Sequence, residues 1–166
     1  MANGLDIRVV FNDIPALKRN LSKLNRTAIQ VGLPTRTGAG IHADSNMTMA
    51  EIGMVHEYGT EKIPQRSFIR QGISAHRPAI ELGLRMCLID AVTHLKSVQF
   101  LDKAFNRVGA ETIGYIYQQF KISGSPSWEP LSPYTIAQRR LASDTPLWDT
   151  GQLVQSLTWE VKYLVR

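Results

Sequence analysis

The sequence predicts an α+β fold, in which a small mixed or antiparallel sheet packs against two long helices and shorter helices lie near the C-terminus. Segments near both ends alternate apolar and polar residues, as strands with one buried face do. Two central segments repeat apolar residues every three or four positions, which is the spacing of amphipathic helices. A length of 166 residues with 43% hydrophobic content indicates one domain over residues 1–166.

The first third of the chain reads as strand, helix, strand. Residues 5–11 and 27–33 are the predicted strands, and they have the composition to lie side by side in one sheet. Asn12 or Asp13 is suited to cap the helix between them. Gly32 within the second strand indicates a bulge or a close neighbour.

Residues 34–46 combine Pro, Gly, Thr, Ser and Asn with little to bury, which predicts a flexible loop. Its Gly38-Ala39-Gly40 stretch is similar to a phosphate-binding turn, but it lacks the third glycine and the Gly-Lys-Ser/Thr sequence. We expect a flexible loop in which Arg36 and His42 are candidates for contact with a partner.

Residues 50–69, here named the joint, predict a helix, a sharp stop and a new helix. A helix over 48–58, capped by Ser45 or Asn46, is expected to end at Gly59. The residue before Pro64 is pushed into an extended conformation, and Ser67 is suited to cap the helix that follows.

The rest of the chain predicts helices joined by polar loops. A long helix over 69–95, with a bend near Pro78, precedes a second one over 101–120. Loops at 122–132 and 142–149, short helices over 133–141 and 150–156, and a final strand over 157–165 complete the chain. In that strand one face carries Leu157, Trp159, Val161 and Tyr163.

No catalytic or metal-binding pattern is complete. His56-Glu57 begins a zinc-protease motif, but Thr60 stands where the second histidine belongs. The single cysteine, Cys87, sits in an apolar run and is expected to be buried. The sequence therefore predicts a protein that is not an enzyme and has no cofactor or metal.

Charge and hydropathy limit the partners. The net charge of +5 permits contact with nucleic acid, but the basic residues are dispersed and only nonspecific phosphate contact is expected. No apolar run approaches the roughly 20 residues that cross a bilayer, so we expect no membrane contact and a cytosol-like compartment.

Two parts of the chain together resemble a known family. The first is AEIGMVHEYGTEKIPQRSFIRQGI at 50–73, and the second joins WEPLSP at 128–133 to PLWDTGQL at 146–153 and Ser-Leu-Thr at 156–158. In this order they resemble the neck and tail-completion proteins of tailed bacteriophages, a virion-morphogenesis group that includes minor tail protein Z-like proteins. The resemblance covers about half of the chain. Residues 65–67 depart from it, where a second small residue or proline is expected near Pro64.

The resemblance implies a structural virion protein made in the host cytoplasm. Such proteins form a homo-oligomeric ring, commonly a hexamer, around the DNA channel where the head meets the tail. Their partners are a head-completion or connector protein on one side and a tail terminator or tail tube protein on the other, with nonspecific contact to genomic DNA. The alternatives are a tail terminator or a nonspecific DNA-associated phage protein.

Candidate interface residues follow from the joint, the first loop and the C-terminal segment. We expect some of the charged residues at the joint to form pairs between subunits, and Tyr58 and Phe68 to anchor the joint by apolar burial, in an interface or only in the subunit's own core. Trp148 is expected to be buried, with partner contact as the alternative. The full set is Arg36, His42, Glu57, Tyr58, Glu61, Lys62, Arg66, Phe68, Arg70 and Trp148.

Overall fold

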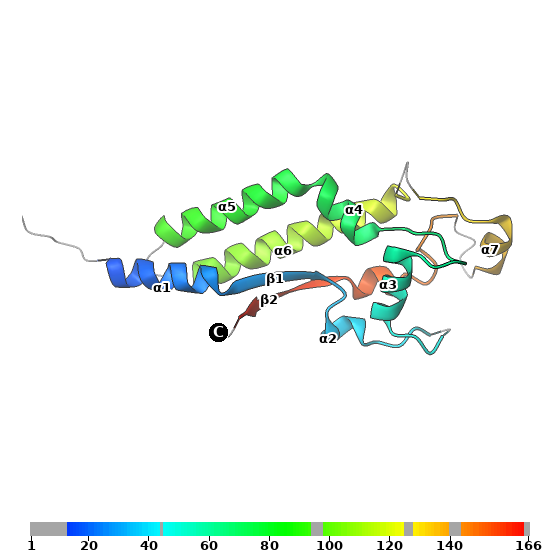
Figure 1. Ribbon diagram of the computed structural model, residues 1–166, viewed down its shortest axis with the longest axis horizontal. Coiled ribbons are helices and arrows are strands. Elements are labelled where there is room, and N and C mark those ends of the chain that lie inside the picture. The colour runs from blue at the N-terminus through cyan, green and yellow to red at the C-terminus, as the bar shows by residue number, and fades with distance from the viewer. Residues whose placement is uncertain (1–12, 44, 94–97, 125–127, 140–143, 165–166) are drawn as a thin grey trace, which may run out of the picture.

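The computed structural model describes residues 13–43, 45–93, 98–124, 128–139 and 144–164. Its helices and strands are α1 (Ile14–Asn25), β1 (Thr27–Gly32), α2 (Thr35–Gly38), α3 (Met49–Tyr58), α4 (Phe68–Ala75), α5 (Arg77–Thr93), α6 (Val98–Lys121), α7 (Pro133–Gln138), α8 (Gln152–Ser156) and β2 (Thr158–Tyr163). The molecule is elongated, and α5 and α6 run along its length (Figure 1). The predicted α+β class is confirmed.

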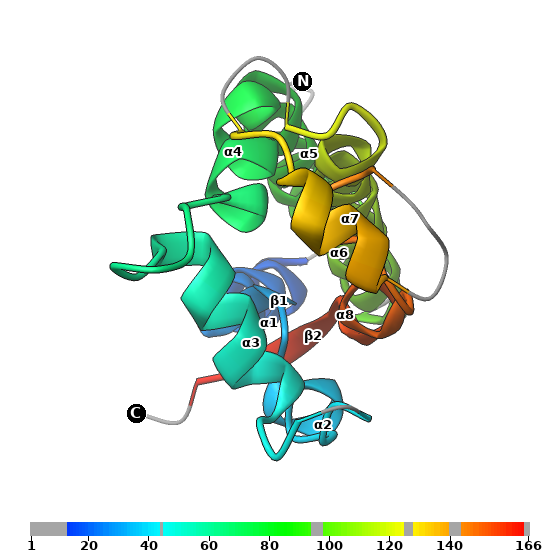
Figure 2. The same ribbon diagram turned by 90° about the vertical axis from the view of Figure 1, so that its right-hand side faces the viewer.

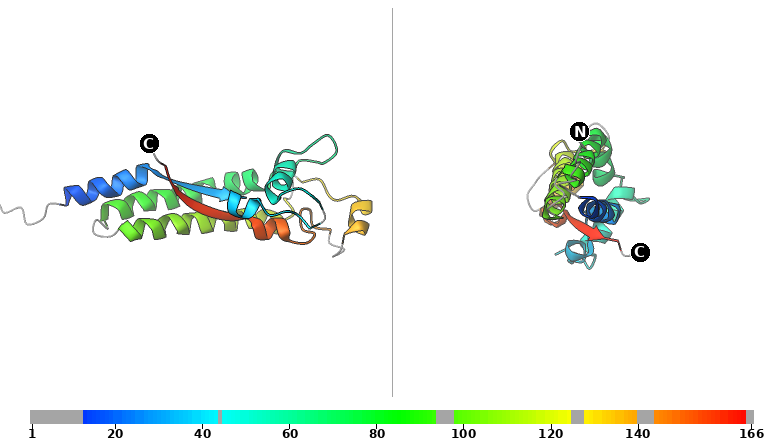
Figure 3. Two further views of the ribbon diagram at one scale, coloured as in Figure 1. Left: turned by 90° about the horizontal axis from the view of Figure 1, so that it is seen from below. Right: turned by 90° about the vertical axis from the view of Figure 1, so that its left-hand side faces the viewer.

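The two described strands come from opposite ends of the sequence. β1 pairs antiparallel with β2, in a register that places Ile29 opposite Val161. On β2, the Trp159 indole donates to Asn106 Oδ1 at 3.1 Å and the Tyr163 hydroxyl donates to Asp102, so both side chains reach α6. The predicted shared face of the last strand is therefore turned toward α6, although Tyr163 at its end is 52% exposed. The sheet lies along the two long helices (Figure 3). The predicted strand over 5–11 lies outside the described residues.

The predicted long helix over 69–95 is two helices. α4 ends at Ala75, His76 leaves the helical conformation at φ −112° and ψ 16°, and α5 starts at Arg77. Pro78 occupies the first turn of α5, where its missing N–H costs no helical hydrogen bond. His76 is half-buried and stacks on Tyr115 with ring centroids 4.2 Å apart. The bend near Pro78 is thus a complete break.

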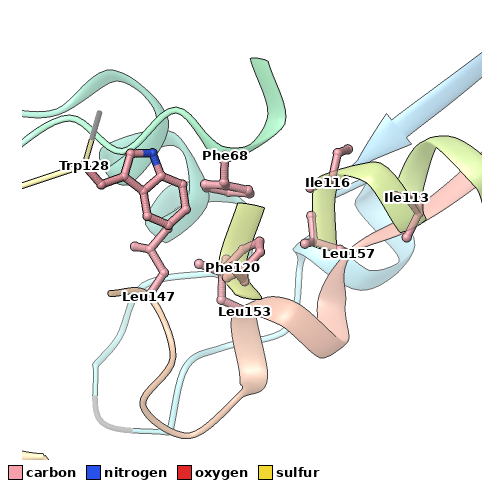
Figure 4. Packing of buried hydrophobic residues seen from close by; sticks show 8 residues of the cluster. All are labelled: Phe68, Ile113, Ile116, Phe120, Trp128, Leu147, Leu153 and Leu157. Atoms are coloured by element: carbon pink, nitrogen blue, oxygen red, sulfur yellow. The ribbon is translucent and has the colours of Figure 1, made fainter. Parts of the chain in front are cut away.

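The core forms two clusters along α6. One gathers Phe68, Ile116, Phe120 and Trp128 with apolar residues from the C-terminal segment, and Figure 4 shows this packing. The other lies between α5 and α6 and includes Cys87, which is fully buried as predicted. Burial raises the pKa of the Cys87 thiol.

Two expectations around the first loop are wrong. The segment 34–46 is not irregular throughout, because it contains the single helical turn α2 and because Ile41 forms a bridge with Thr48. The cap of α3 is Thr48, not Ser45 or Asn46. Its hydroxyl accepts from Glu51 N at 3.2 Å while Glu51 Oε2 accepts from Thr48 N at 2.7 Å. This reciprocal pair is a Thr-x-x-Glu capping box that the sequence already contains.

Candidate functional site

The segments that carry the family resemblance meet at one end of the molecule. They line a hollow of about 580 Å³. The joint contributes His56, Lys62 and Arg66, and the C-terminal segments contribute Glu129, Arg139 and Asp149. Figure 2 looks at this end, with α3 and α7 toward the viewer. We call it the junction hollow.

The joint owes its shape to a glycine stop. α3 ends where Gly59 adopts φ +74°, a conformation that side chains with a Cβ rarely take. A Cβ at this position would lie 3.0 Å from the backbone nitrogen of Gln65, because the chain turns back on itself here. Arg66 N then donates to His56 O at 2.7 Å, which closes the turn.

Glu57 connects the two helices of the joint. Its carboxylate accepts from the backbone N–H groups of Ile69 and Arg70, each at 3.0 Å. These donors belong to the first turn of α4, where N–H groups have no partner within the helix. Ser67 lies at the N-cap position, but its hydroxyl instead donates to Glu57 O at 2.8 Å. The predicted capping role of Ser67 is therefore wrong, and Glu57 fulfils it.

Arg66 links the joint to the C-terminal segments. It is only 5% exposed, and its Nη2 donates to Glu129 O at 3.0 Å. Burial lowers the pKa of this guanidinium; Glu129 raises it and the nearby Arg139 lowers it. Arg66 Nε has no hydrogen-bond partner among the described residues. The side chain thus holds two distant segments together.

His56 lines the junction hollow with an uncharged imidazole. Burial, followed by the charges of Arg66 and Arg139, lowers its pKa from 6.5 to about 4. At neutral pH the imidazole is therefore uncharged, and it sits beside two cations. Fixed cations, neutral imidazole and apolar walls suit the binding of a polar or acidic segment.

The C-terminal segments are anchored by buried side chains. Trp128 is 7% exposed, its Nε1 donates to Gln71 Oε1 at 2.7 Å, and its ring meets Phe120 edge-on at 6.1 Å. Leu147 and Leu153 pack into the same cluster (Figure 4). Trp128, Leu147 and Leu153 therefore belong to the core, and the two leucines also line the junction hollow.

Arg139 bonds to the backbone of the loop that follows it, and both border the junction hollow. Its Nη1 donates to Thr145 O at 2.6 Å and to Trp148 O at 3.3 Å. These two bonds tie the half-buried Arg139 to the loop that follows it in the same subunit. Its neighbour Arg140 lies outside the described residues.

The structure divides the ten candidate interface residues into three groups. Phe68 is fully buried and Glu57 and Arg66 are nearly so, so these three act within the subunit. The apolar burial predicted for Phe68 is confirmed. His42 is half-buried in the wall of the junction hollow. The exposed residues are Arg36, Tyr58, Glu61, Lys62, Arg70 and Trp148.

The expected burial in the subunit's own core is wrong for two residues, and the alternative of burial against a partner stays a prediction for both. Tyr58 is 68% exposed, and its ring lies under the Arg70 guanidinium, whose Cζ is 5.4 Å from the ring centroid. Trp148 is 39% exposed, because the turn at φ +63° on Leu147 directs that leucine inward instead. Alternation of apolar residues could not distinguish Leu147 from Trp148, since the loop has no regular period.

Sequence reasoning missed Gln71, Glu129 and Asp149 as parts of this end. Their roles depend on which distant segments meet, and no local spacing signals that. Among the described residues no three His, Cys, Asp or Glu side chains gather as a metal site. Within the same part of the chain, no helix is both long and apolar enough to span a bilayer.

Comparisons with protein-family models, with curated proteins and with solved structures found no match to this chain.

Proposed function

We propose that this chain is a structural protein of the neck of a tailed bacteriophage, which completes the tail and joins it to the head as a ring around the DNA channel. One observation carries the proposal. The segments at 50–73, 128–133 and 146–158, which bear the resemblance, come together around the junction hollow although they are far apart in sequence. Shared motifs that converge on one surface are typical of a common binding role.

The partners of this surface are other virion proteins. The exposed rim of the hollow carries Lys62, and Glu61 is exposed beside it. Rim charges of this kind fix register and partner choice in protein interfaces. A head-completion or connector ring and a tail terminator or tail tube are the neighbours that the resemblance implies. The protein then resides in the virion neck after synthesis in the host cytoplasm.

Electron microscopy of particles assembled without this protein tests the joining role. We expect filled heads and free tails that do not unite, and recovery of joined particles when the protein is supplied. Normal numbers of joined, infectious particles in its absence would overturn the proposal.

A charge exchange at the rim tests the junction hollow itself. The double variant Glu61→Lys with Lys62→Glu keeps the net charge and changes only exposed side chains. We expect it to fold normally and to lower the yield of joined particles about tenfold or more, as loss of a few rim contacts does. The control exchanges Arg107→Glu with Glu111→Arg, two exposed positions on α6, and should join particles normally.

A basic hollow at the other end of the subunit favours nonspecific DNA contact as a second function. Lys18, Arg19 and Lys23 of α1 and Arg26 directly after it line a depression of about 750 Å³ together with Tyr163. Lys23 is neutralised by Asp102 at 2.7 Å. Among the described residues no carboxylate pairs with Lys18, Arg19 or Arg26, so a row of cations faces outward. A linear polyanion such as a DNA backbone matches that row.

Fluorescence anisotropy with a short DNA duplex tests this second function. We expect binding that weakens steeply between about 50 and 200 mM salt, with a log–log slope that falls by about 0.9 for each phosphate contact removed. Lys18→Glu with Arg19→Glu should reduce that slope, while reversal of the exposed Arg107 should not. Equal loss from both variants, or no binding at low salt, would exclude a DNA site on α1.

A further inference from the structure

The outer face of α5 carries several apolar side chains. Five aliphatic or thioether side chains on it are between 39% and 59% exposed: Leu82, Met86, Leu88, Ile89 and Val92. The inner face meanwhile buries Cys87 and Ala91 completely against α6 and α1. Apolar helix faces are normally buried. Within the described part of the chain, α5 is covered on one side only.

The neighbouring long helix shows that this exposure is specific to α5. The exposed positions of α6 are mostly polar or charged, among them Lys103, Arg107 and Glu111. α6 therefore has an ordinary solvated side, although it is longer than α5. Figure 1 shows α5 along one edge of the molecule, with α6 on its inner side.

The spacing of the exposed residues suits another helix. Leu82, Met86 and Ile89 recur at steps of four and three, which brings them into one line on the side opposite Cys87. Leu88 and Val92 form an adjacent line four residues apart. Lines of this kind are the ridges that interdigitate when two helices pack. An apolar line three to four residues apart is what a second helix requires.

The exposed apolar area of α5 extends onto α1. The five side chains of α5 together leave roughly 150 to 300 Å² of apolar surface in water, if a fully exposed side chain is taken as about 60–120 Å². One side of a standard interface covers about 800 Å², of which somewhat more than half is apolar. α1 adds Ile14 at 60% and Leu21 at 41% exposure, and it adjoins α5 through Asn20, whose Nδ2 donates to Ala91 O at 2.9 Å.

We propose that the outer face of α5 is the contact between two copies of this chain. The composition of the face favours a second copy over a different partner. Between Leu82 and Val92 the charged residues are Arg85, which is exposed, and Asp90, which is half-buried, and the Arg77–Glu81 pair at 2.8 Å neutralises itself at the start of the helix. Interfaces between identical subunits are more apolar than transient ones, which depend on charged rims.

This contact deepens the proposed function, because it names one surface through which subunits associate. The α5 contact rests on the proposed function only for where the assembly lies in the particle. An experiment can therefore refute the contact without refuting the neck function, and the reverse. Self-association is measured on the purified chain, whereas head–tail joining is measured on particles.

Sedimentation of the purified chain tests the contact. We expect a species well above the 18.6 kDa subunit mass at micromolar concentration. Leu82→Glu with Ile89→Glu should convert it to a monomer with unchanged helical content. Met54→Glu is the matched control, since Met54 on α3 is 60% exposed and Leu82 is 59% exposed. A monomeric wild-type chain, or equal dissociation by the control, would overturn the inference.

A labelling experiment avoids variants that add charge. In a Cys87→Ser background, Ile89→Cys should react slowly with a maleimide in the assembled protein and rapidly after dilution to the monomer. Met54→Cys should react rapidly under both conditions. Rapid labelling at position 89 in the assembled protein would place the contact elsewhere and refute the assignment to α5.

Discussion

Glu57 and Arg70 contact each other at three points where α3 gives way to α4. The Arg70 backbone N–H donates to Glu57 Oε1 at 3.0 Å, and its Nη2 donates to Glu57 O at 3.3 Å. The guanidinium Nε also lies 3.6 Å from the same carboxylate oxygen. Burial raises the pKa of this carboxyl, while the bonds from Ile69 and Arg70 and the charge of Arg70 lower it. The direction of the joint thus depends on one buried carboxylate.

Replacing that carboxylate should destabilise the subunit. Glu57→Gln keeps the shape but sets an amide N–H₂ against a backbone N–H donor, so one donor at the start of α4 loses its partner. We expect a loss of about 1–3 kcal/mol in the free energy of unfolding, measured by urea denaturation. Glu61→Gln changes an exposed residue four positions further along the chain, and it should alter the free energy of unfolding by less than about 0.5 kcal/mol. Equal effects of the two variants would show that the Glu57 contacts contribute nothing.

The contrast between Gly59 and Glu57 shows what the sequence could predict. A stop after α3 follows from local backbone chemistry, because glycine alone among residues takes φ +74° without steric cost. The partner of Glu57 does not follow, since the carboxylate meets N–H groups twelve and thirteen residues further along the chain. That contact exists only once the joint has folded.

The same division holds for the candidate site. Phe68 was expected to anchor the joint by apolar burial, and it is fully buried. Arg66 was expected at an interface as one of the charged residues of the joint, but it is buried and donates to the backbone carbonyl of Glu129 in a distant segment. Periodicity predicts which face is buried, whereas the neighbours of a buried polar group depend on tertiary packing.

His56 should make the stability of the subunit depend on pH. Its native pKa of about 4 lies below the usual 6.5, so the unfolded chain binds a proton before the native chain does. A depressed native pKa gives stability that is complete above about pH 6.5 and is lost as the pH falls toward 4. Between pH 7 and pH 5 this single group should cost about 2 kcal/mol.

A His56→Gln variant isolates that contribution. Glutamine does not titrate, so the variant should lose less stability than wild type between pH 7 and pH 5, in urea titrations at matched ionic strength. The comparison also removes the opposite trend of Glu57, whose raised pKa favours the native state as the pH falls. Parallel pH curves for the two proteins would mean that His56 titrates normally in the fold.

Cys87 should report on opening of the second core cluster. It is fully buried between α5 and α6, and burial raises the pKa of its thiol. Because the thiolate is the reactive form, native protein should react with a thiol reagent at least about a hundredfold more slowly than unfolded protein. Absorbance assays with a chromogenic disulfide would measure both rates. Comparable rates in the two states would contradict the packing of α5 on α6.

Two glycines of α6 should respond oppositely to the same substitution. A Cβ at Gly109 would lie 2.3 Å from Trp159 Cδ1 and 3.1 Å from Trp159 Cβ, so an alanine there must displace the indole and the strand β2 that carries it. Gly114 has no heavy atom within 4 Å of the same position. α6 is therefore closely packed on the sheet at the first glycine and open at the second.

Gly109→Ala should accordingly lose about 1–3 kcal/mol of stability, the usual cost of overpacking a filled site. Gly114→Ala should gain about 0.5–1 kcal/mol, because alanine has the higher helix propensity and leaves the unfolded chain less free. Thermal or urea unfolding of the two variants beside wild type measures both signs. Since the two share one helix, a general effect on helicity would stabilise both. Opposite signs require the contact between α6 and Trp159.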